Sequence, residues 1–238
     1  MWHRFYEDVT LRFAPDMKVD LNPSDRMHGQ IAFLGYYERG LSKTIARIGR
    51  DIGGKFVDIG ANIGYFTLLW VAQDQENEAI AIEPSPRVTS LLRKNVKRNG
   101  VEERVTIVEA AAGREEGEIK FDLGPENELG WGGVTKEKIG TVTKDSQGTI
   151  YVPEHRLDDL VVGPVSLLKV DVEGAETWVF QGSESLLRTQ EIERICFENN
   201  RARARQLGIE SKEPTGVLKK HGYNISENGD MLWAEPGS

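Results

Sequence analysis

The sequence predicts an α/β fold in which a mostly parallel sheet is covered by helices on both faces. From Lys55 onward, short apolar runs alternate with longer amphipathic runs, which is the pattern of successive strand–helix units in a parallel sheet. The chain ends with two strand-like runs around Asn228-Gly229, and an Asn-Gly pair in that position favours a β-hairpin. We therefore expect the sheet to finish with an antiparallel hairpin strand.

The first 50 residues differ from this pattern and are interpreted as a small N-terminal extension or cap with strands and a helix. Residues 1–35 consist of short alternating runs interrupted by prolines and a glycine, which is typical of short strands. Apolar residues then follow at helical spacing, Leu41, Ile45 and Ile48. They predict a helix that ends near Gly49. We accordingly divide the chain into an extension over 1–50 and one domain over 51–238.

Inside the domain, each apolar run of strand length is followed by a helical pattern or a turn. Strands are predicted at 55–60, 78–84, 104–113, 117–124, 165–174 and 192–200, and helices at 63–73, 85–100, 175–188 and 215–222. The helix at 85–100 has the clearest boundaries, because Ser85 is placed to cap its start and Pro86 fits its first position. The run at 117–124 is expected at an edge of the sheet.

The composition is that of an ordinary globular protein, with 39% apolar and 29% charged residues in a chain of 238. The formal net charge of −8 argues against nucleic acid as a partner, because phosphate binding needs a concentrated basic surface. No apolar run approaches the roughly 18 residues of a transmembrane helix, and the first residues lack a secretory pattern. The single cysteine, Cys196, lies in an apolar run. We expect a buried thiol and a cytoplasmic protein without membrane contact.

A glycine-containing loop joins the first predicted strand of the domain to its helix, and such a loop usually binds a nucleotide-like cofactor. A dinucleotide fingerprint that starts at Gly60 would need glycine at positions 62 and 65, where the chain has Asn62 and Tyr65. The carboxylate of Asp58 would also face the negative pyrophosphate of a dinucleotide at short range. It favours a ligand with positive charge there, and S-adenosylmethionine carries an ammonium beside a sulfonium.

Further cofactor contacts are predicted at the ends of the next two strands. Glu83 ends the second strand, where an acid can accept hydrogen bonds from both ribose hydroxyls. Glu109 and Ala110 end the third strand and would lie along the adenine edge. The predicted cofactor-binding residues are therefore Asp58, Gly60, Ala61, Asn62, Gly64, Glu83, Glu109 and Ala110.

Five motifs occur in order along the chain: VDIGANIGYFT, IAIEP, EAAAG, RLDDL and LKVDVEGAE. Together they resemble the FkbM family of S-adenosylmethionine-dependent methyltransferases, over residues 36–200. The resemblance implies a Rossmann-like class I methyltransferase sheet with a reversed hairpin strand, in agreement with the hairpin predicted at Asn228-Gly229. It also implies methyl transfer to oxygen, since characterised relatives modify hydroxyls of sugars and of macrolide-type natural products. Residues 1–35 lie outside the resemblance.

The predicted catalytic residues lie where the fourth and fifth strands end. Methyl transfer is an in-line displacement that needs a positioned oxygen nucleophile and removal of its proton. The ligand crevice of a parallel sheet lies outside the carboxyl ends of its strands, where the chain has Asp171, Glu173, Glu198 and Asn199.

Three interpretations of these residues stay open. In the first, Asp171 or Glu173 is the general base, with its pKa raised by a dry pocket and a like charge, and Glu198 completes the catalytic group. In the second, Asp171, Glu198 and Asn199 bind Mg²⁺, an arrangement similar to metal-dependent catechol O-methyltransferases. In the third, the acids only cap the helices that follow.

The polar, glycine-rich connection from Pro125 to Thr149 is expected to be a lid or binding loop. Its Trp131 either stacks on the acceptor or packs on the sheet, and His155 lies where the loop returns. Both are candidate substrate contacts. The expected acceptor is a small molecule or glycan, and the pattern leaves the oligomeric state open. The alternative functions are an NAD-dependent oxidoreductase and a catalytically silent cofactor-binding module.

Overall fold

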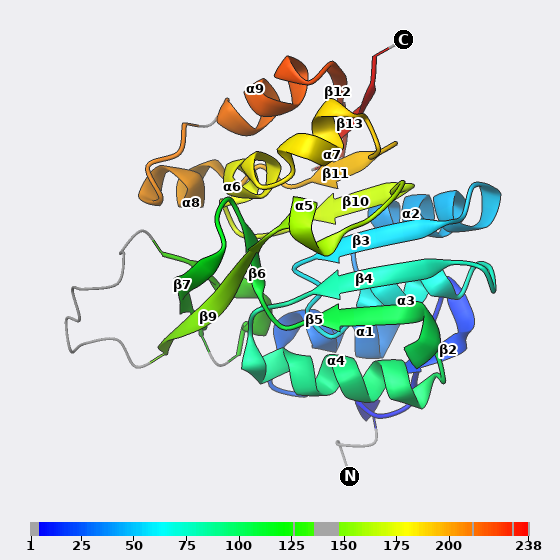
Figure 1. Cartoon of the computed structure of the whole chain (residues 1–238). Coiled ribbons are helices and arrows are strands. Elements are labelled where there is room, and N and C mark those ends of the chain that lie inside the picture. Colours follow the sequence, from blue (N-terminus) through cyan, green and yellow to red (C-terminus); the bar gives the residue numbers. More distant parts are fainter. Residues whose placement is uncertain (1–4, 126, 136–147, 211, 230, 238) are drawn as a thin grey trace.

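The computed structural model describes residues 5–125, 127–135, 148–210, 212–229 and 231–237. Within these residues the central sheet has seven strands in the order β12-β13-β11-β10-β3-β4-β5 (Figure 1). Their bounds are β3 Lys55–Ile59, β4 Glu78–Ile82, β5 Val105–Val108, β10 Leu167–Val170, β11 Ile195–Phe197, β12 Tyr223–Asn228 and β13 Met231–Pro236. The strands from β5 to β11 are parallel, β13 is antiparallel to β11, and β12 pairs with β13 as a hairpin. The predicted fold class is confirmed.

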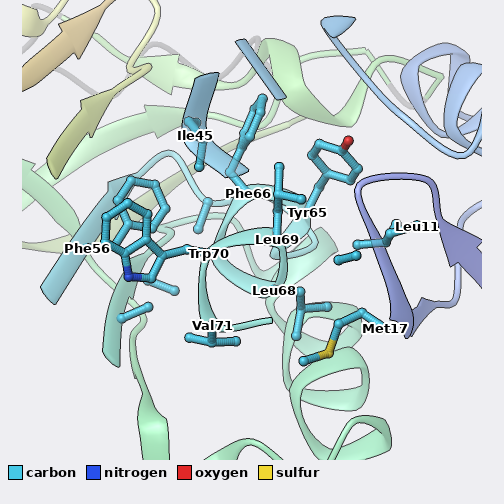
Figure 2. Close-up of a cluster of buried hydrophobic side chains, with 14 of the residues drawn as sticks. Leu11, Met17, Ile45, Phe56, Tyr65, Phe66, Leu68, Leu69, Trp70 and Val71 are labelled. Carbon is cyan, nitrogen blue, oxygen red and sulfur yellow. The ribbon is translucent and has the colours of Figure 1, made fainter. Parts of the chain in front are cut away.

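Helices form two cores against this sheet. One core contains α2 Arg39–Asp51, α3 Tyr65–Val71 and α4 Pro86–Arg98. The other contains α5 Leu157–Leu160, α6 Glu176–Gln181, α7 Glu184–Arg188 and α9 Glu213–Lys220. Because side chains alternate along a strand, Phe56 of β3 enters the first core and Val57 the second. Figure 2 shows the first core, where the rings of Phe56 and Trp70 stack with centroids 5.2 Å apart.

A smaller sheet lies beside the central one, with strand order β6-β9-β7-β8. Its strands are β6 Ala111–Gly113, β7 Gly117–Asp122, β8 Gly133–Val134 and β9 Thr149–Arg156. The strand predicted at 104–113 is wrong in extent, because the chain leaves the central sheet after β5 and pairs again, as β6, with β9. The edge position predicted for 117–124 is also wrong, since β7 lies between β9 and β8.

The helix predicted at 175–188 is divided into α6 and α7, and Gly182 lies between them. A Cβ at Gly182 would lie 1.9 Å from the carbonyl oxygen of Gly113 in β6. Only glycine therefore fits at this break, because another part of the chain approaches it closely, and no local pattern reveals that approach. The buried thiol predicted for Cys196 is confirmed.

The N-terminal segment consists of β1 Val9–Leu11, β2 Ala14–Val19 and α1 Arg26–Leu34. The short strands expected over residues 1–35 do not reach Ile31, because the apolar run there forms the end of α1. The helix starts where the Asp25 side chain accepts a hydrogen bond from the His28 backbone N–H, which is a typical N-cap. Leu11 and Ile31 are fully buried in the same core as Leu68 of α3. The division of the chain at residue 50 stays a prediction.

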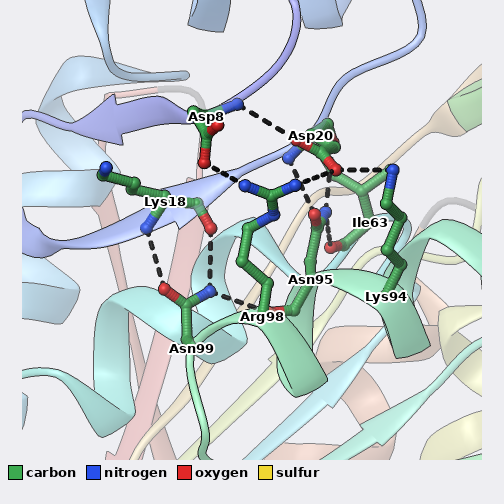
Figure 3. Close-up of polar contacts among 8 residues, drawn as sticks. All are labelled: Asp8, Lys18, Asp20, Ile63, Lys94, Asn95, Arg98 and Asn99. Atoms are coloured by element: carbon green, nitrogen blue, oxygen red, sulfur yellow. Dashed lines mark hydrogen bonds and ion pairs between the residues drawn. The ribbon is translucent and has the colours of Figure 1, made fainter.

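A polar seam joins β2 to α4 beneath the glycine loop, and Figure 3 shows it. The buried Asn95 of α4 accepts from the Asp20 N–H at 2.8 Å and donates to the carbonyls of Asp20 and Ile63. The Asp20 carboxylate pairs with Lys94 at 2.7 Å and Arg98 at 2.9 Å. The N-terminal segment is thus hydrogen-bonded, through α4, to the loop that follows β3.

No helix in the described part of the chain has the length and apolar character needed to cross a lipid bilayer.

Candidate functional site

A cavity of about 490 Å³ opens at the carboxyl ends of the parallel strands, a size common for small-molecule sites. One side is formed by the segments that follow β3, β4, β10 and β11: Gly60, Ala61, Asn62, Glu83, Asp171, Glu173 and Glu198. Another part of the wall is formed by the start of α1, by the turn before β8 and by the first residue of β8: Asp25, Arg26, Met27, Gln30, Trp131 and Gly133.

The glycine loop is folded tightly against the neighbouring strands. Gly60 has φ +75°, and a Cβ there would lie 1.9 Å from the Asp171 carbonyl oxygen, so no side chain fits. Its N–H and that of Ala61 donate to the Ile82 carbonyl at 2.9 and 3.2 Å. Gly64, with φ +82°, is the residue before α3. This backbone path exposes Gly60, Ala61 and Asn62 to the cavity, whereas Gly64 is not among the described lining residues.

Glu83 is anchored at the end of β4 with both carboxylate oxygens in use. Oε2 accepts from the Asn62 N–H at 2.9 Å and Oε1 from the Ser85 N–H at 2.8 Å. Burial raises the pKa of Glu83 to about 7, although the two N–H donors oppose this rise. Each carboxylate oxygen can accept more than one hydrogen bond. Glu83 therefore still has acceptor capacity toward the cavity.

Asp58 is fully buried and is not among the described residues that line the cavity. Its Oδ2 accepts from the Thr67 hydroxyl at 2.7 Å, and its Oδ1 lies 3.6 Å from the Lys169 ammonium. The positive charge expected beside Asp58 is therefore supplied by the protein. Lys169 was the available signal for the Asp58–Lys169 pair, because it is a lysine inside an otherwise apolar strand. The set of site residues predicted from the sequence does not include Lys169.

Lys169 also lies 3.2 Å from Oδ2 of Asp171. Burial alone would lower the pKa of Lys169, but the carboxylates of Asp171 and Asp58 raise it above its usual value. The ammonium stays charged and connects the buried Asp58 to Asp171, which reaches the cavity wall.

Glu173 has a backbone conformation that is uncommon for a side-chain-bearing residue, with φ +54°, and such conformations cluster at functional sites. Its Oε2 accepts from the Asn200 amide at 2.8 Å. Burial, reinforced by the Asp171 carboxylate, raises the pKa of Glu173 to about 7. The cap interpretation fails for Asp171, because α6 starts later, with Ala175 at its cap.

The residues predicted to bind Mg²⁺ do not fit a metal site. Asp171 and Glu198 line the cavity, but Asn199 is not among the described lining residues. No three His, Cys, Asp or Glu side chains gather as possible metal ligands in the described part of the chain. The Lys169 ammonium already neutralises Asp171, so a divalent cation would meet a positive charge there.

Three other predicted residues lie away from the cavity wall. Glu109 pairs with Arg93 of α4 at 2.6 Å. Its neighbour Ala110 is not among the described lining residues, but Ala111 and Ala112 line the cavity. His155 contacts Glu116 at 2.7 Å on the smaller sheet, also outside the described cavity wall. The positions of Glu109 and Ala110 follow from the turn that carries the chain from β5 to the smaller sheet.

Trp131 lies at the cavity rim with 61% of its surface exposed, so most of the residue faces solvent. Its carbonyl accepts from Arg203 of α8 Arg201–Gln206 at 2.8 Å. Part of the predicted lid, residues 126 and 136–147, lies outside the described residues.

The side of the cavity formed by α1 was not predicted from the sequence, because this segment carries no motif. Arg26 pairs with Glu128 at 3.1 Å and so links α1 to the turn that carries Trp131. The Asp25 cap was the available signal, since an acid at a helix start predicts the helix. Its place beside the glycine loop depends on tertiary packing alone.

Two solved structures share the fold. A putative caffeoyl-CoA O-methyltransferase from Staphylococcus aureus has a TM-score of 0.55 and 12% identity, covering 90% of this chain and 93% of that chain. Methyltransferase FkbM from Methylobacillus flagellatus KT has a TM-score of 0.51 and 15% identity, covering 76% of this chain and 43% of that chain. At this identity the likeness is one of fold.

Two curated relatives are methyltransferases. Methyltransferase 1 of Beauveria bassiana (strain ARSEF 2860) is 28% identical over 142 residues, which are 53% of this chain and 57% of that protein. Methyltransferase sdnD of Sordaria araneosa is 24% identical over 205 residues, 72% of this chain and 74% of that protein. The chain thus spans little more than half of the Beauveria relative. The model of the methyltransferase FkbM domain matches residues 58–225, most of the chain, and the protein therefore belongs to the FkbM methyltransferase family.

Proposed function

We propose that the protein is an S-adenosylmethionine-dependent methyltransferase that acts on a hydroxyl oxygen of a small molecule, sugar or natural product. The observation that carries this proposal is Glu83, a buried acid fixed at the end of β4 by N–H groups of the glycine loop and of Ser85. An acid in this position binds ribose hydroxyls in Rossmann-like folds. Family membership supports methyl transfer as the reaction.

The residues at the cavity fit this cofactor. The backbone of Gly60 and Ala61 faces the cavity without side-chain bulk, and Glu83 has acceptor capacity left for hydroxyls. Asp171 and Glu198 on the same wall supply negative charge for a cationic ligand. When bound, S-adenosylmethionine supplies an electrophilic methyl group on its sulfonium.

The protein residues would then position the acceptor and take its proton. Glu173 is the preferred base, since a pKa of about 7 matches proton transfer near neutral pH. Asp171, held by Lys169, and Glu198 would orient the hydroxyl. The exposed Trp131 ring at the rim suits stacking on a sugar or another ring. A carboxylate-lined wall disfavours a phosphate-rich acceptor such as nucleic acid.

Two alternative functions are weaker. An NAD-dependent oxidoreductase would place a pyrophosphate where the chain has Asn62 instead of the glycine that permits close approach. A silent cofactor-binding module would not need three acids on the cavity wall, yet Asp171, Glu173 and Glu198 all line it.

Calorimetric titration of the protein with S-adenosylmethionine, S-adenosylhomocysteine and NAD, each with and without Mg²⁺, tests the cofactor. We expect micromolar binding of the first two, no binding of NAD and no effect of Mg²⁺. At pH 8, where a carboxyl with a pKa of about 7 is mostly ionised, Glu83→Gln should weaken S-adenosylhomocysteine binding about tenfold or more, because a charged acceptor contributes roughly 1.5–3 kcal/mol. The exposed Glu118→Gln is the matched control. Binding of NAD alone would overturn the assignment, and a screen of hydroxylated acceptors tests the transfer itself.

A further inference from the structure

His28 is fully buried in the first turn of α1, next to the glycine loop. Its backbone N–H donates to Asp25 Oδ1 at 3.0 Å, and its ring Nδ1 accepts from the Asn22 N–H at 2.9 Å. A neutral imidazole that accepts at Nδ1 carries its proton on Nε2. Burial lowers the pKa of His28 and favours this neutral form, although the Asp25 carboxylate opposes the shift. The Nε2–H is thus a fixed donor.

The side chain of Asn62 in the glycine loop lies beside the His28 ring, within range of a side-chain interaction. Nε2 of His28 and Oδ1 of Asn62 are both buried, and neither has a formed hydrogen bond within the described residues. At the other end of the amide, Asn62 Nδ2 lies 3.1 Å from the position a Cβ would take on Gly130, at the cavity rim. Asn62 also contributes its backbone N–H to Glu83.

This arrangement decides which end of the Asn62 amide faces the cavity. If the amide were rotated by half a turn, its NH₂ group would meet the Nε2–H of His28, donor against donor. With Oδ1 toward His28, the NH₂ group stays turned to the rim and the cavity.

We infer that His28 is a positioning residue for cofactor binding: its Nε2–H engages Oδ1 of Asn62 and keeps the amide NH₂ turned to the cavity. The inference rests on the proposed function, because it takes the cavity to bind the adenosyl cofactor. If the inference holds, the N-terminal segment affects cofactor affinity through His28, although His28 does not itself line the described cavity wall.

Two substitutions separate the two nitrogens of His28. His28→Asn keeps an acceptor near Nδ1 for the Asn22 N–H but has no group at Nε2. His28→Gln places an amide donor near Nε2 but loses the Nδ1 acceptor. Both should lower the melting temperature. In calorimetric titration with S-adenosylhomocysteine, we expect the affinity to fall about tenfold in His28→Asn and to stay within threefold of wild type in His28→Gln.

The outcomes distinguish the inference from the proposed function. Failure of the wild-type protein to bind S-adenosylhomocysteine would contradict the proposed function. Equal affinity of the two folded variants would overturn the role of His28 alone, since a purely structural role follows stability and not the position of the donor.

A measurement on the wild-type protein covers the case in which a variant does not fold. In histidine-selective ¹⁵N NMR, His28 should show the Nε2–H tautomer, and its Nε2 signal should shift when S-adenosylhomocysteine is added. His221, in the turn after α9, is the internal reference. A His28 signal that does not change at saturation, or an Nδ1–H tautomer, would refute the inference.

Discussion

Glu173 combines a left-handed backbone, a hydrogen bond from Asn200 and a place on the cavity wall. Burial and the nearby Asp171 carboxylate raise its pKa to about 7, while the Arg203 guanidinium limits the rise. A base must be deprotonated to accept a proton. With an acceptor found by screening, kcat/KM should therefore rise with pH, reach half its maximum near pH 7 and level off above it.

The Glu173→Gln variant tests this role directly. Turnover should fall at least about a hundredfold, the usual contribution of a general base, while S-adenosylhomocysteine affinity stays within twofold of wild type. The exposed Glu184→Gln should leave both unchanged. Turnover near the wild-type level would instead assign the base to Asp171 or Glu198, and a parallel loss of binding would show that Glu173 acts through the cofactor.

Among the elements, α4 and its C-cap contact the end of β2 and the residue after it through two asparagines one helical turn apart. Asn95 bonds to both backbone groups of Asp20 and to the Ile63 carbonyl in the glycine loop. Asn99 makes the same pair of bonds to Lys18, at 2.9 and 2.7 Å, but in an exposed position and without a contact to the loop in the structure described. The two residues therefore form a matched pair for testing how the loop is supported.

Asn95→Ala leaves buried backbone groups without partners and should lower the free energy of unfolding by about 2–4 kcal/mol. Asn99→Ala should cost no more than about 1 kcal/mol, because water replaces its bonds. Urea unfolding measures both. S-adenosylhomocysteine binding should weaken in the Asn95 variant only, since the loop loses a support. Unchanged binding in the Asn95 variant would show that Asn95 supports the N-terminal segment and not the loop.

Some positions of the candidate site can be predicted from the order of strands and helices, and others depend on tertiary packing. The strand-end residues Glu83, Asp171 and Glu173 are predictable, because the order of parallel strands places them at one edge of the sheet. A short apolar run such as that around Ile31 fits a strand or a helix equally well, and packing against α3 decides for the helix. Lys169 is visible in the sequence, but its position beside Asp58 depends on strand register.

On the scale of the whole molecule, acids with raised pKa values make stability depend on pH, among them the buried Glu83 and Glu176 and the half-buried Glu173. Burial raises the pKa of Glu83 and Glu173 to about 7 and that of Glu176 to about 8, each from an ordinary value of 4.5. A raised carboxyl pKa means that the native state binds more protons than the unfolded state. These acids therefore stabilise the fold below about pH 4.5 relative to neutral pH, and this contribution is lost as pH rises through 7 to 8.

Glu176 isolates this effect because it lies outside the described cavity wall and is 1% exposed. Its Oε1 accepts from the Gly174 N–H at 2.9 Å, a bond that Glu176→Gln retains without a charge to bury. Wild-type stability should fall between pH 5 and 8 by up to about 1.4 kcal/mol per pH unit for each such group. The variant should match wild type near pH 5 and exceed it at pH 8, as measured by urea unfolding at four pH values. The exposed Glu184→Gln should keep the wild-type slope, and an unchanged slope in Glu176→Gln would show that Glu176 is ionised in the native state throughout this range.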